Sequence, residues 1–425
     1  MAPEAEDRLS SLLARRRALL GPAYRTFYER PIEIVRGEGV HLFDRDGTEY
    51  LDAYNNVPVV GHSHPRVVAA IAEQAGRLNT NTRYPAEPIL DYAERVLGTL
   101  GTDLDRVMFT CSGSEANDLA LRIARFWTGK AGLVVTANAY HGVTAAVAEA
   151  SPSLGSSVAP GPSVRTIPPP APAAEDAEAV GGRMAAELRS AVAELEAGGT
   201  GFAALLIDSI FSSDGIVPDP IGFLRPVAEA VRAAGGLLIV DEVQAGFGRT
   251  GGMWGFQRHR LEPDLVTMGK PMGNGMPVAA VAGRAELLDR FGRQVRYFNT
   301  FGGSSVSIAA ATAVLDVIQQ EDLMENAADV GIYLRTGLEG LVARSPILCN
   351  VRGAGLFVAA DAIAPDGDQA QVASRILNGL RDRRVLVGTT GMRGEVLKIR
   401  PPLVFARADA DRLLEALEGV LRTLA

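Results

Sequence analysis

The chain has 425 residues, of which 47% are hydrophobic and 22% are charged, so it can form two or three globular domains. Its 50 acidic residues outnumber the 42 basic ones, and the net charge of −8 argues against a nucleic-acid surface. No apolar run approaches the ~18 residues of a membrane span, and the start lacks a signal-peptide pattern. Cys111 and Cys349 lie far apart, so we expect a cytoplasmic protein without disulfides.

Residues 1–55 predict a leading segment that packs with the C-terminal part of the chain. Apolar positions at helical spacing predict a helix over residues 8–20, ended by Gly21 and Pro22. Two short strands are expected next, over residues 32–35 and 40–43.

Residues 56–304 predict a large domain of alternating strands and helices. Short runs of Val, Ile and Leu without polar alternation are typical of strands buried on both faces of a mainly parallel sheet. Six strands are expected, over residues 106–110, 133–136, 203–207, 237–240, 265–268 and 278–281. The segment 151–182 is rich in Pro, Ala, Gly and Ser, and we interpret it as an excursion within this domain.

Residues 305–425 predict a smaller α/β domain that opens with a helix through Ile318. Its expected strands cover residues 350–351, 356–359, 385–387 and 396–399.

The carboxyl ends of strands are where ligands bind in open α/β sheets. The first such end leads from residues 106–110 through Ser112, Gly113 and Ser114 into a helix. Free N–H groups and the helix dipole at this point favour a phosphate. The alternative is an ordinary serine cap with Glu115 in the first turn.

The second strand end carries Tyr140, His141 and Gly142, which follow residues 133–136. The Tyr140 ring offers a flat face for stacking on a heteroaromatic ring. Taken alone, an aromatic residue beside a glycine is more often loop packing.

The third strand end places Asp241 directly after the apolar run 237–240, with Val243 and Gln244 following. A buried carboxylate is costly unless a cation partners it, and a protonated ring nitrogen is such a cation. An Asp-Glu pair could instead bind Mg²⁺, but the GxxxxGK[ST] motif that would hold a triphosphate is missing.

The fourth strand end is Lys270, which leaves residues 265–268 into a glycine-rich loop. Lysine otherwise occurs only at positions 130 and 398, so a merely solvated loop lysine is disfavoured. A lysine buried near other cations has a lowered pKa and becomes a nucleophile toward a carbonyl. A phosphate cradle, a stacking ring, a buried carboxylate and this lysine together predict pyridoxal 5'-phosphate as the cofactor.

With these motifs in place, the chain resembles the class III aminotransferases of the type I pyridoxal-phosphate fold, almost from end to end. The resemblance is carried by residues 52–56, 61–65, 112–117, 140–142, 241–249, 269–270 and 299–303. Residues 54–57, 113–122 and 397–402 are similar to the ethanolamine-phosphate phospho-lyases and the mitochondrial alanine–glyoxylate aminotransferases. The resemblance implies a seven-stranded, mainly parallel sheet between helices and a smaller C-terminal α/β domain.

The resemblance also implies roles for the residues at the strand ends. Lys270 would hold the cofactor as a Schiff base and shuttle a proton, and Asp241 would keep the ring nitrogen protonated. Val243 and Tyr140 would sandwich the ring, and Gln244 would reach its phenolic oxygen. Further cofactor contacts are implied for Ser112, Gly113, Ser114, His141 and, from a neighbouring subunit, Thr300.

A homodimer with shared active sites follows from the implied role of Thr300. His62 and His64 form an HxH pair without further ligands nearby in sequence, so we interpret them as structural and expect no metal.

The substrate pocket departs from the family pattern. Family members that use glutamate usually carry an arginine near the turn that matches residues 140–142, which Val143 and Thr144 follow here. They also carry a gating glutamate in the segment that matches residues 208–215, where this chain has Ser213. Lys398 and Arg400 lie two apart and so share one face of a strand, where they could meet an anionic substrate. The alternative is that both lie outside the pocket. The candidate substrate residues are Tyr54, Asn56, Ser213, Lys398 and Arg400.

The predicted function is amino transfer between a primary amine or amino acid and an oxo acid. The alternative is a phospho-lyase, which eliminates phosphate and ammonia from a phosphorylated amine. A non-catalytic cofactor-binding protein is disfavoured because Lys270 and Asp241 occur together.

Overall fold

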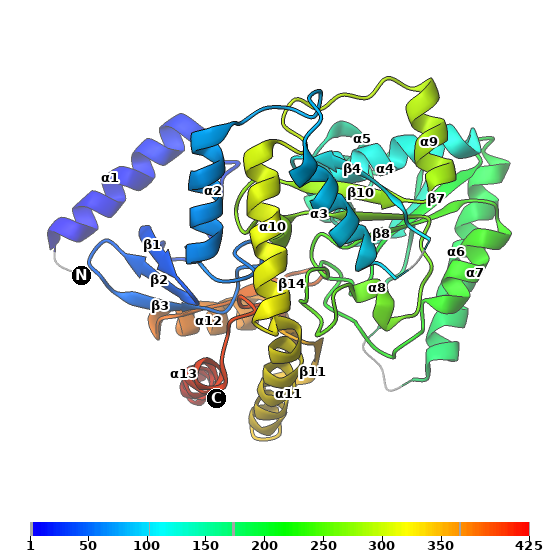
Figure 1. Ribbon diagram of the computed structural model, residues 1–425. Helices are drawn as coiled ribbons and strands as arrows, with labels where there is room; N and C mark the ends of the chain where they lie inside the picture. The colour runs from blue at the N-terminus through cyan, green and yellow to red at the C-terminus, as the bar shows by residue number, and fades with distance from the viewer. Residues whose placement is uncertain (1–2, 102, 172–174, 365–366, 425) are drawn as a thin grey trace.

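The computed structural model describes residues 3–101, 103–171, 175–364 and 367–424, and statements about its elements refer to these ranges. A large α/β body carries the N-terminal and C-terminal elements on one side (Figure 1). None of the helices in the described ranges has both the length and the apolar character needed to cross a membrane.

The large body is built on a seven-stranded sheet in the order β4-β10-β9-β8-β7-β5-β6. All pairings are parallel except those of β10, which runs antiparallel to both of its neighbours. The predicted mainly parallel, seven-stranded sheet is therefore confirmed, including the six strands expected from the sequence. The strands are β4 (Arg106–Thr110), β5 (Gly132–Thr136), β6 (Val164–Ile167), β7 (Phe202–Asp208), β8 (Leu237–Asp241), β9 (Leu265–Met268) and β10 (Ala279–Gly283).

The edge strand β6 is absent from the sequence-based prediction. It lies within residues 151–182 and pairs in parallel with β5, which makes this segment part of the large body. Only its two end residues, Val164 and Ile167, are buried, so the strand has too few apolar positions to stand out. Residues 172–174 of the same segment lie outside the described residues.

Helices cover both faces of this sheet. Leu206 and Ile239 share one core with the helices α4 (Gly113–Thr128) and α9 (Ala285–Gln294). Alternate residues of the same strands, such as Leu205, share the other core with α6 (Ala177–Ala197) and α7 (Arg225–Ala233). Burial on both faces explains why these strands lack polar alternation. Smaller helical pieces in this part are α3 (Glu87–Gly98), α5 (Ala145–Ala148) and α8 (Gly255–Arg258).

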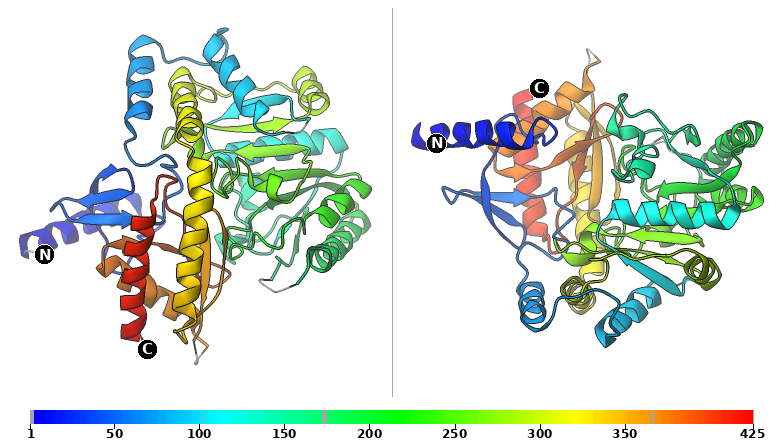
Figure 2. Two further views of the ribbon diagram at one scale, coloured as in Figure 1. Left: turned by 60° about the horizontal axis from the view of Figure 1, so that its bottom comes forward. Right: turned by 90° about the horizontal axis from the view of Figure 1, so that it is seen from above.

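The C-terminal part has its own four-stranded sheet, in the order β11-β12-β15-β14. The strands β11 (Leu348–Ala354) and β12 (Phe357–Ala362) are longer than predicted, β14 (Gly388–Thr390) was not predicted, and β15 (Val396–Ile399) was. Figure 2 shows α10 and α11 running from the large body into this part. Its helices are α10 (Ser305–Gln320), α11 (Leu323–Val342), α12 (Gln369–Asp382) and α13 (Arg407–Leu424).

The N-terminal segment shares a sheet with the C-terminal part. The antiparallel strands β1 (Ile34–Glu38), β2 (His41–Asp44) and β3 (Glu49–Asp52) are completed by β13 (Val385–Leu386), which pairs in parallel with β3. The first strand starts and ends later than predicted, because residues 36–38 pair with β2. Helix α1 (Pro3–Leu20) precedes this sheet, and α2 (Pro65–Arg77) follows it. The division at residues 55 and 304 stays a prediction.

Candidate active site

A cavity of about 420 Å³ lies at the carboxyl ends of β7 and β8 and beside the start of α4. All the predicted cofactor residues except Thr300 line it, together with Asp208, which sequence analysis did not single out. Those predicted residues are Ser112, Gly113, Ser114, Tyr140, His141, Asp241, Val243, Gln244 and Lys270.

The start of α4 forms one wall of the cavity. The Ser112 hydroxyl accepts a hydrogen bond from the Glu115 N–H at 3.3 Å, and the Glu115 carboxylate accepts from the backbone of Ser112 in return. The serine cap considered as an alternative is therefore present. The capping box leaves the Gly113 and Ser114 N–H groups without intrahelical acceptors, so it is compatible with a phosphate at the same helix end.

The backbone around this helix end leaves no room for larger residues. A Cβ atom on Gly113 would lie 2.9 Å from the Val243 side chain, and one on Gly142 would lie 2.4 Å from the Ser114 hydroxyl. Gly142 also has a φ of +144°, which other residues rarely adopt. These glycines let the two loops approach the helix closely and shape the cradle.

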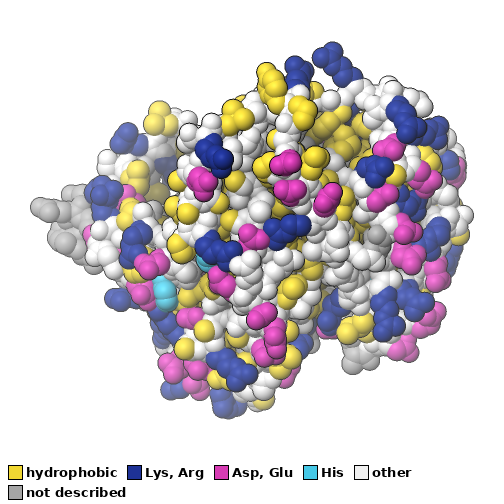
Figure 3. All heavy atoms as spheres, in the orientation of Figure 1, with side chains coloured by type: hydrophobic (Ala, Val, Ile, Leu, Met, Phe, Trp, Pro, Cys, Tyr) yellow, Lys and Arg dark blue, Asp and Glu magenta, His cyan; other side chains and the backbone are white. Residues whose placement is uncertain are grey.

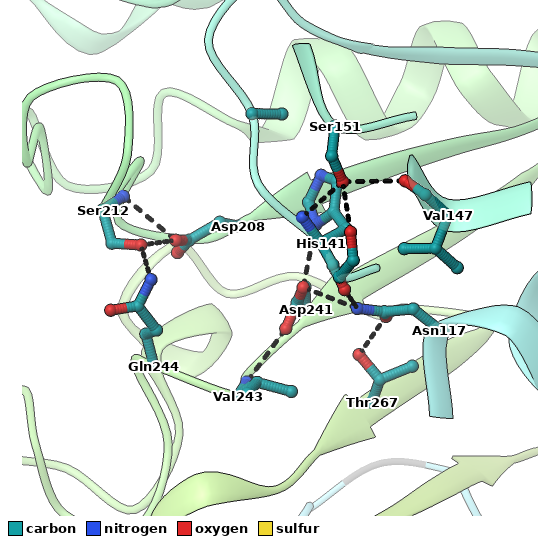
Figure 4. Close-up of polar contacts among 12 residues, drawn as sticks. Asn117, His141, Val147, Ser151, Asp208, Ser212, Asp241, Val243, Gln244 and Thr267 are labelled. Atoms are coloured by element: carbon teal, nitrogen blue, oxygen red, sulfur yellow. Dashed lines mark hydrogen bonds and ion pairs between the residues drawn. The ribbon is translucent and has the colours of Figure 1, made fainter. Parts of the chain in front are cut away.

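Asp241 is buried and is held by three hydrogen-bond donors (Figure 4). Its Oδ2 atom accepts from Asn117 Nδ2 at 2.9 Å and lies 2.8 Å from His141 Nδ1, and its Oδ1 accepts from the Val243 N–H at 3.0 Å. Burial alone would raise the pKa of Asp241, but His141, Lys270 and the Val243 N–H together lower it. The carboxylate is thus charged and suited to a protonated ring nitrogen.

A further layer fixes the two side-chain donors. Asn117 accepts a hydrogen bond from Thr267 Oγ1 at 2.7 Å and donates to the His141 carbonyl at 2.8 Å. The His141 N–H donates to Ser151 Oγ at 3.0 Å. His141 therefore supports Asp241 with its ring, and its predicted contact with the cofactor stays a prediction.

Lys270 follows β9 after the single residue Gly269, and its backbone has a positive φ of 33°. Burial lowers the pKa of Lys270, an effect that Arg400 reinforces and that the Asp241 and Asp208 carboxylates oppose. The amine lies 6.0 Å from the centre of the Tyr140 ring. A buried amine with a lowered pKa is a nucleophile for an aldehyde, so the residues present fit pyridoxal 5'-phosphate at its ring nitrogen, phosphate and aldehyde.

Behind the cavity, the basic residues Lys398 and Arg400 are buried rather than exposed. As their spacing predicts, they share a face, and each cationic group lies 5.4 Å from the centre of the Phe357 ring. Lys398 Nζ donates to the Ser212 carbonyl at 3.1 Å, while Arg400 donates to the side-chain oxygen of Gln244. Neither base is among the residues that line the cavity, but Arg400 contacts Gln244, which does.

The other candidate substrate residues occupy different places. Tyr54 lines a second cavity beneath α1, where its ring packs against Phe27. Asn56 is buried and donates to the Gln244 carbonyl at 3.1 Å. The Ser213 carbonyl accepts a hydrogen bond from Asn138 Nδ2 at 2.6 Å. Their roles toward a substrate stay predictions.

Sequence analysis did not identify three residues that shape the site, namely Asp208, Ser212 and Asn117. Asp208 ends the apolar strand β7 just as Asp241 ends β8, so the same signal could have found it. Ser212 and Asn117 act through contacts with residues 32 and 124 positions away, respectively, which no local pattern reveals.

Thr300 is exposed and lies outside the cavity of its own chain. The two histidines interpreted as structural each face a carboxylate: His62 Nε2 lies 2.6 Å from Asp52, and His64 Nε2 lies 3.6 Å from Glu321. Within the described ranges, no group of three His, Cys, Asp or Glu residues could hold a metal ion.

The sheet order, the strand-end lysine and the paired aspartate define a pyridoxal-phosphate enzyme of the type I fold. Comparison with known proteins then specifies the family. The pattern of the family "Aminotransferase class-III" matches residues 24–421, so the chain belongs to the class III aminotransferases and uses pyridoxal 5'-phosphate.

Individual relatives carry two different activities in their names. An Arabidopsis thaliana protein named alanine–glyoxylate aminotransferase 2 homolog 2, mitochondrial, is 39% identical over 96% of this chain and 86% of its own length. A Caenorhabditis elegans protein named ethanolamine-phosphate phospho-lyase homolog 1 is 36% identical over 96% and 93%. The solved structure of an Arthrobacter phospholyase in complex with phosphoethanolamine is 46% identical, covers 97% of this chain and 100% of that chain, and superposes with a TM-score of 0.94.

Proposed function

We propose that Lys270 and Asp241 carry out amino transfer on an amine or amino acid that bears an anionic group. The observation that carries the proposal is the buried Lys270 amine, with its lowered pKa, in one cavity with the ionised Asp241 and the start of α4. When bound, the cofactor supplies an aldehyde and an electron sink. Lys270 would hold that aldehyde and move a proton at the substrate carbon, and Asp241 would hold the proton on the ring nitrogen.

The anionic group is proposed because two buried bases lack a carboxylate partner. Among the described residues, neither Lys398 nor Arg400 forms an ion pair within 4.0 Å. Burial lowers the pKa of both residues, and the neighbouring Arg400 lowers that of Lys398 further, because their charged forms lack compensation. A carboxylate or phosphate on the substrate would provide that compensation. With Ser213 at the gate position, we expect glutamate and 2-oxoglutarate to be poor substrates.

A second candidate is phosphate elimination from a phosphorylated amine. It is supported by the same two bases and by the similarity to the Arthrobacter phospholyase. A single turnover with amine alone separates the two functions. Amino transfer leaves the cofactor in its amine form, whereas elimination returns the aldehyde and releases inorganic phosphate and ammonia.

Substrate choice is tested by steady-state assays with glutamate, alanine, phosphoethanolamine and neutral amines. We expect an anionic amine other than glutamate to have the highest kcat/KM. Glutamate as the best donor by a wide margin would contradict the proposal.

We further propose that the enzyme is a homodimer and that Thr300 completes the phosphate site of the partner subunit. The surrounding surface is unusually apolar: Phe298, Phe301, Tyr84 and Leu78 are exposed by 41% to 70%. Hydrophobic side chains gather in the upper part of the face shown in Figure 3, above α2 and α3. Such a patch is typical of a protein interface.

Mixing two inactive variants tests this arrangement. Chains with Lys270→Ala and chains with an inactivating Thr300 substitution should regain some activity when they form hybrid dimers. A fully active monomer in light scattering would contradict the proposal.

A cytoplasmic location is also a proposal, supported by two cysteines that are both free. The Arabidopsis relative is named mitochondrial, so fractionation of cells that express the tagged full-length protein is the direct test.

A further inference from the structure

Ser212 links two residues of the cavity wall, Asp208 and Gln244. Its hydroxyl donates to Asp208 Oδ2, and it accepts from Gln244 Nε2 at 2.6 Å (Figure 4). The side-chain oxygen of Gln244 accepts from Arg400 in turn. Ser212, Arg400 and Gln244 are buried, at 0%, 6% and 9% exposure.

The chemistry of the two ends fixes the direction of every hydrogen bond in this chain. At one end, Asp208 accepts from the Ile210 and Ser212 N–H groups, each at 3.0 Å, and so acts as an acceptor. At the other end, the Arg400 guanidinium can only donate. The Ser212 hydroxyl must therefore point its proton at Asp208 and receive one from Gln244.

This order determines how the amide of Gln244 is oriented. Its oxygen is used by Arg400, and one of its two N–H bonds is used by Ser212. The second N–H bond remains, on a residue that lines the cavity. We propose that Ser212, backed by Asp208, is a positioning residue that presents the free N–H of Gln244 to an anionic oxygen of the bound cofactor.

The backbone of Ser212 is held independently of its hydroxyl. Its carbonyl accepts from Lys398 Nζ at 3.1 Å and from Thr390 Oγ1 at 2.9 Å, and its N–H donates to Asp208. Removal of the hydroxyl should leave this loop in place. A change in Ser212→Ala can then be assigned to the side-chain hydrogen bonds.

The inference rests on the proposed binding of the cofactor to Lys270, and its test uses the cofactor's own spectrum. A pH titration of the visible band measures how readily the bound cofactor takes up a proton. A hydrogen bond to its phenolic oxyanion favours the deprotonated form. In the purified full-length holoenzyme, Ser212→Ala should therefore move the transition upward by about half a pH unit to one unit, the size expected for one neutral hydrogen bond.

Two variants serve as controls. Ser212→Thr keeps the hydroxyl and should retain the wild-type transition. Ser209 is a matched buried serine three residues away, whose hydroxyl donates to the Glu242 carboxyl at 2.7 Å and not to the cavity wall. Ser209→Ala should lower stability without moving the transition.

An unchanged transition in Ser212→Ala would overturn the inference, and so would an equal shift in Ser209→Ala. A wild-type protein that takes up no cofactor would overturn the proposed function together with it. If Ser212→Ala does not fold, Asp208→Asn tests the chain of hydrogen bonds from its other end. An amide can donate as well as accept, so the fixed direction is lost and the same upward shift is expected.

Discussion

Asp241 and Asp208 occupy equivalent positions on neighbouring strands, and yet their pKa values shift in opposite directions. The two residues are paired in register at the ends of β8 and β7, and both follow fully apolar runs. The pKa of Asp241 is lowered, because His141 and other donors outweigh its burial. The pKa of Asp208 is raised by burial, which the Ser212 and Ile210 donors only partly offset. The groups around each carboxylate, rather than its strand position, therefore set the direction in which its pKa shifts.

The two sides also differ in where their partners come from. The residues that fix Asp241 all belong to the large body, between Asn117 and Thr267. The Asp208 side reaches through Gln244 to Arg400 and through the Ser212 backbone to Lys398, both in the C-terminal part. The surroundings of Asp241, called the cofactor side below, are thus preorganised within one part of the chain. The residues from Asp208 through Gln244 to Lys398 and Arg400 are called the substrate side, because the two bases are proposed to meet the substrate although Gln244 also faces the cofactor. This side depends on the contact between two parts of the chain.

The largest expected effect on turnover is that of Lys270→Ala, which removes the amine whose pKa both carboxylates raise. Both the bond to the cofactor and the proton shuttle are lost, so turnover should fall by about 10³-fold or more. Borohydride reduction of the wild type, followed by peptide mass mapping, should find the cofactor on Lys270. A label on Lys398 or Lys130 would contradict the assignment.

Asp241→Asn tests whether the cofactor side depends on charge. The amide cannot hold the ring nitrogen protonated, and a loss of two pKa units of preference predicts about a 100-fold slower single turnover. Asp208→Asn removes only the fixed direction of the hydrogen bonds to Ser212 and Gln244, which is worth less than a charge at the ring nitrogen, so we expect it to slow the reaction by less than about 10-fold. Equal losses of rate in the two variants would contradict the difference proposed between the two carboxylates.

The cofactor side could be predicted from the sequence because each of its elements has a local signal. A charged residue at the end of an apolar run identified Asp241 and Lys270, and glycines marked the backbone that turns around the helix start. The same signal was present at Asp208 but was not used. The His141 contact to Asp241 spans 100 residues and depends on tertiary packing, so the sequence alone does not reveal it.

The substrate side could be predicted less well. The spacing of Lys398 and Arg400 predicted that they share one face of a strand. Their burial and their contacts to Ser212 and Gln244 arise only when two parts of the chain meet. The strands β6 and β14 were missed for a related reason. Each is only three or four residues long and is defined by pairing with a neighbour rather than by its own pattern.

Lys398→Met tests whether the substrate side recognises an anionic group. Loss of the buried Lys398 amine, whose charged form an anionic substrate would stabilise, should raise KM for an anionic amine by about 10-fold to 100-fold, the range of a hydrogen bond to a charged group. The KM for neutral amines should change little. Lys130, which pairs with Glu196 on the surface at 2.9 Å, offers Lys130→Met as a matched control without effect. Equal KM changes for neutral and anionic amines would contradict a role in anion recognition.

The smallest effect concerns the scaffold behind Asp208 and is expected in stability rather than in turnover. His259 is fully buried, lies 3.1 Å from the Ser209 carbonyl through Nε2, and accepts from the Gly222 N–H at 3.2 Å. Both ring nitrogens are thus satisfied in the neutral form, and burial lowers the pKa of His259 from 6.5 to about 4. Between these two values the unfolded chain binds a proton that the folded chain does not, so the free energy of unfolding falls as pH decreases from 6.5 to 4. The loss should approach about 1.4 kcal/mol per pH unit from this group.

His259→Gln cannot titrate and can still donate and accept, so its urea unfolding curves should depend less on pH in that range than those of the wild type. If the variant showed the same pH dependence as the wild type, protonation of His259 would not be the cause of the decrease in the free energy of unfolding.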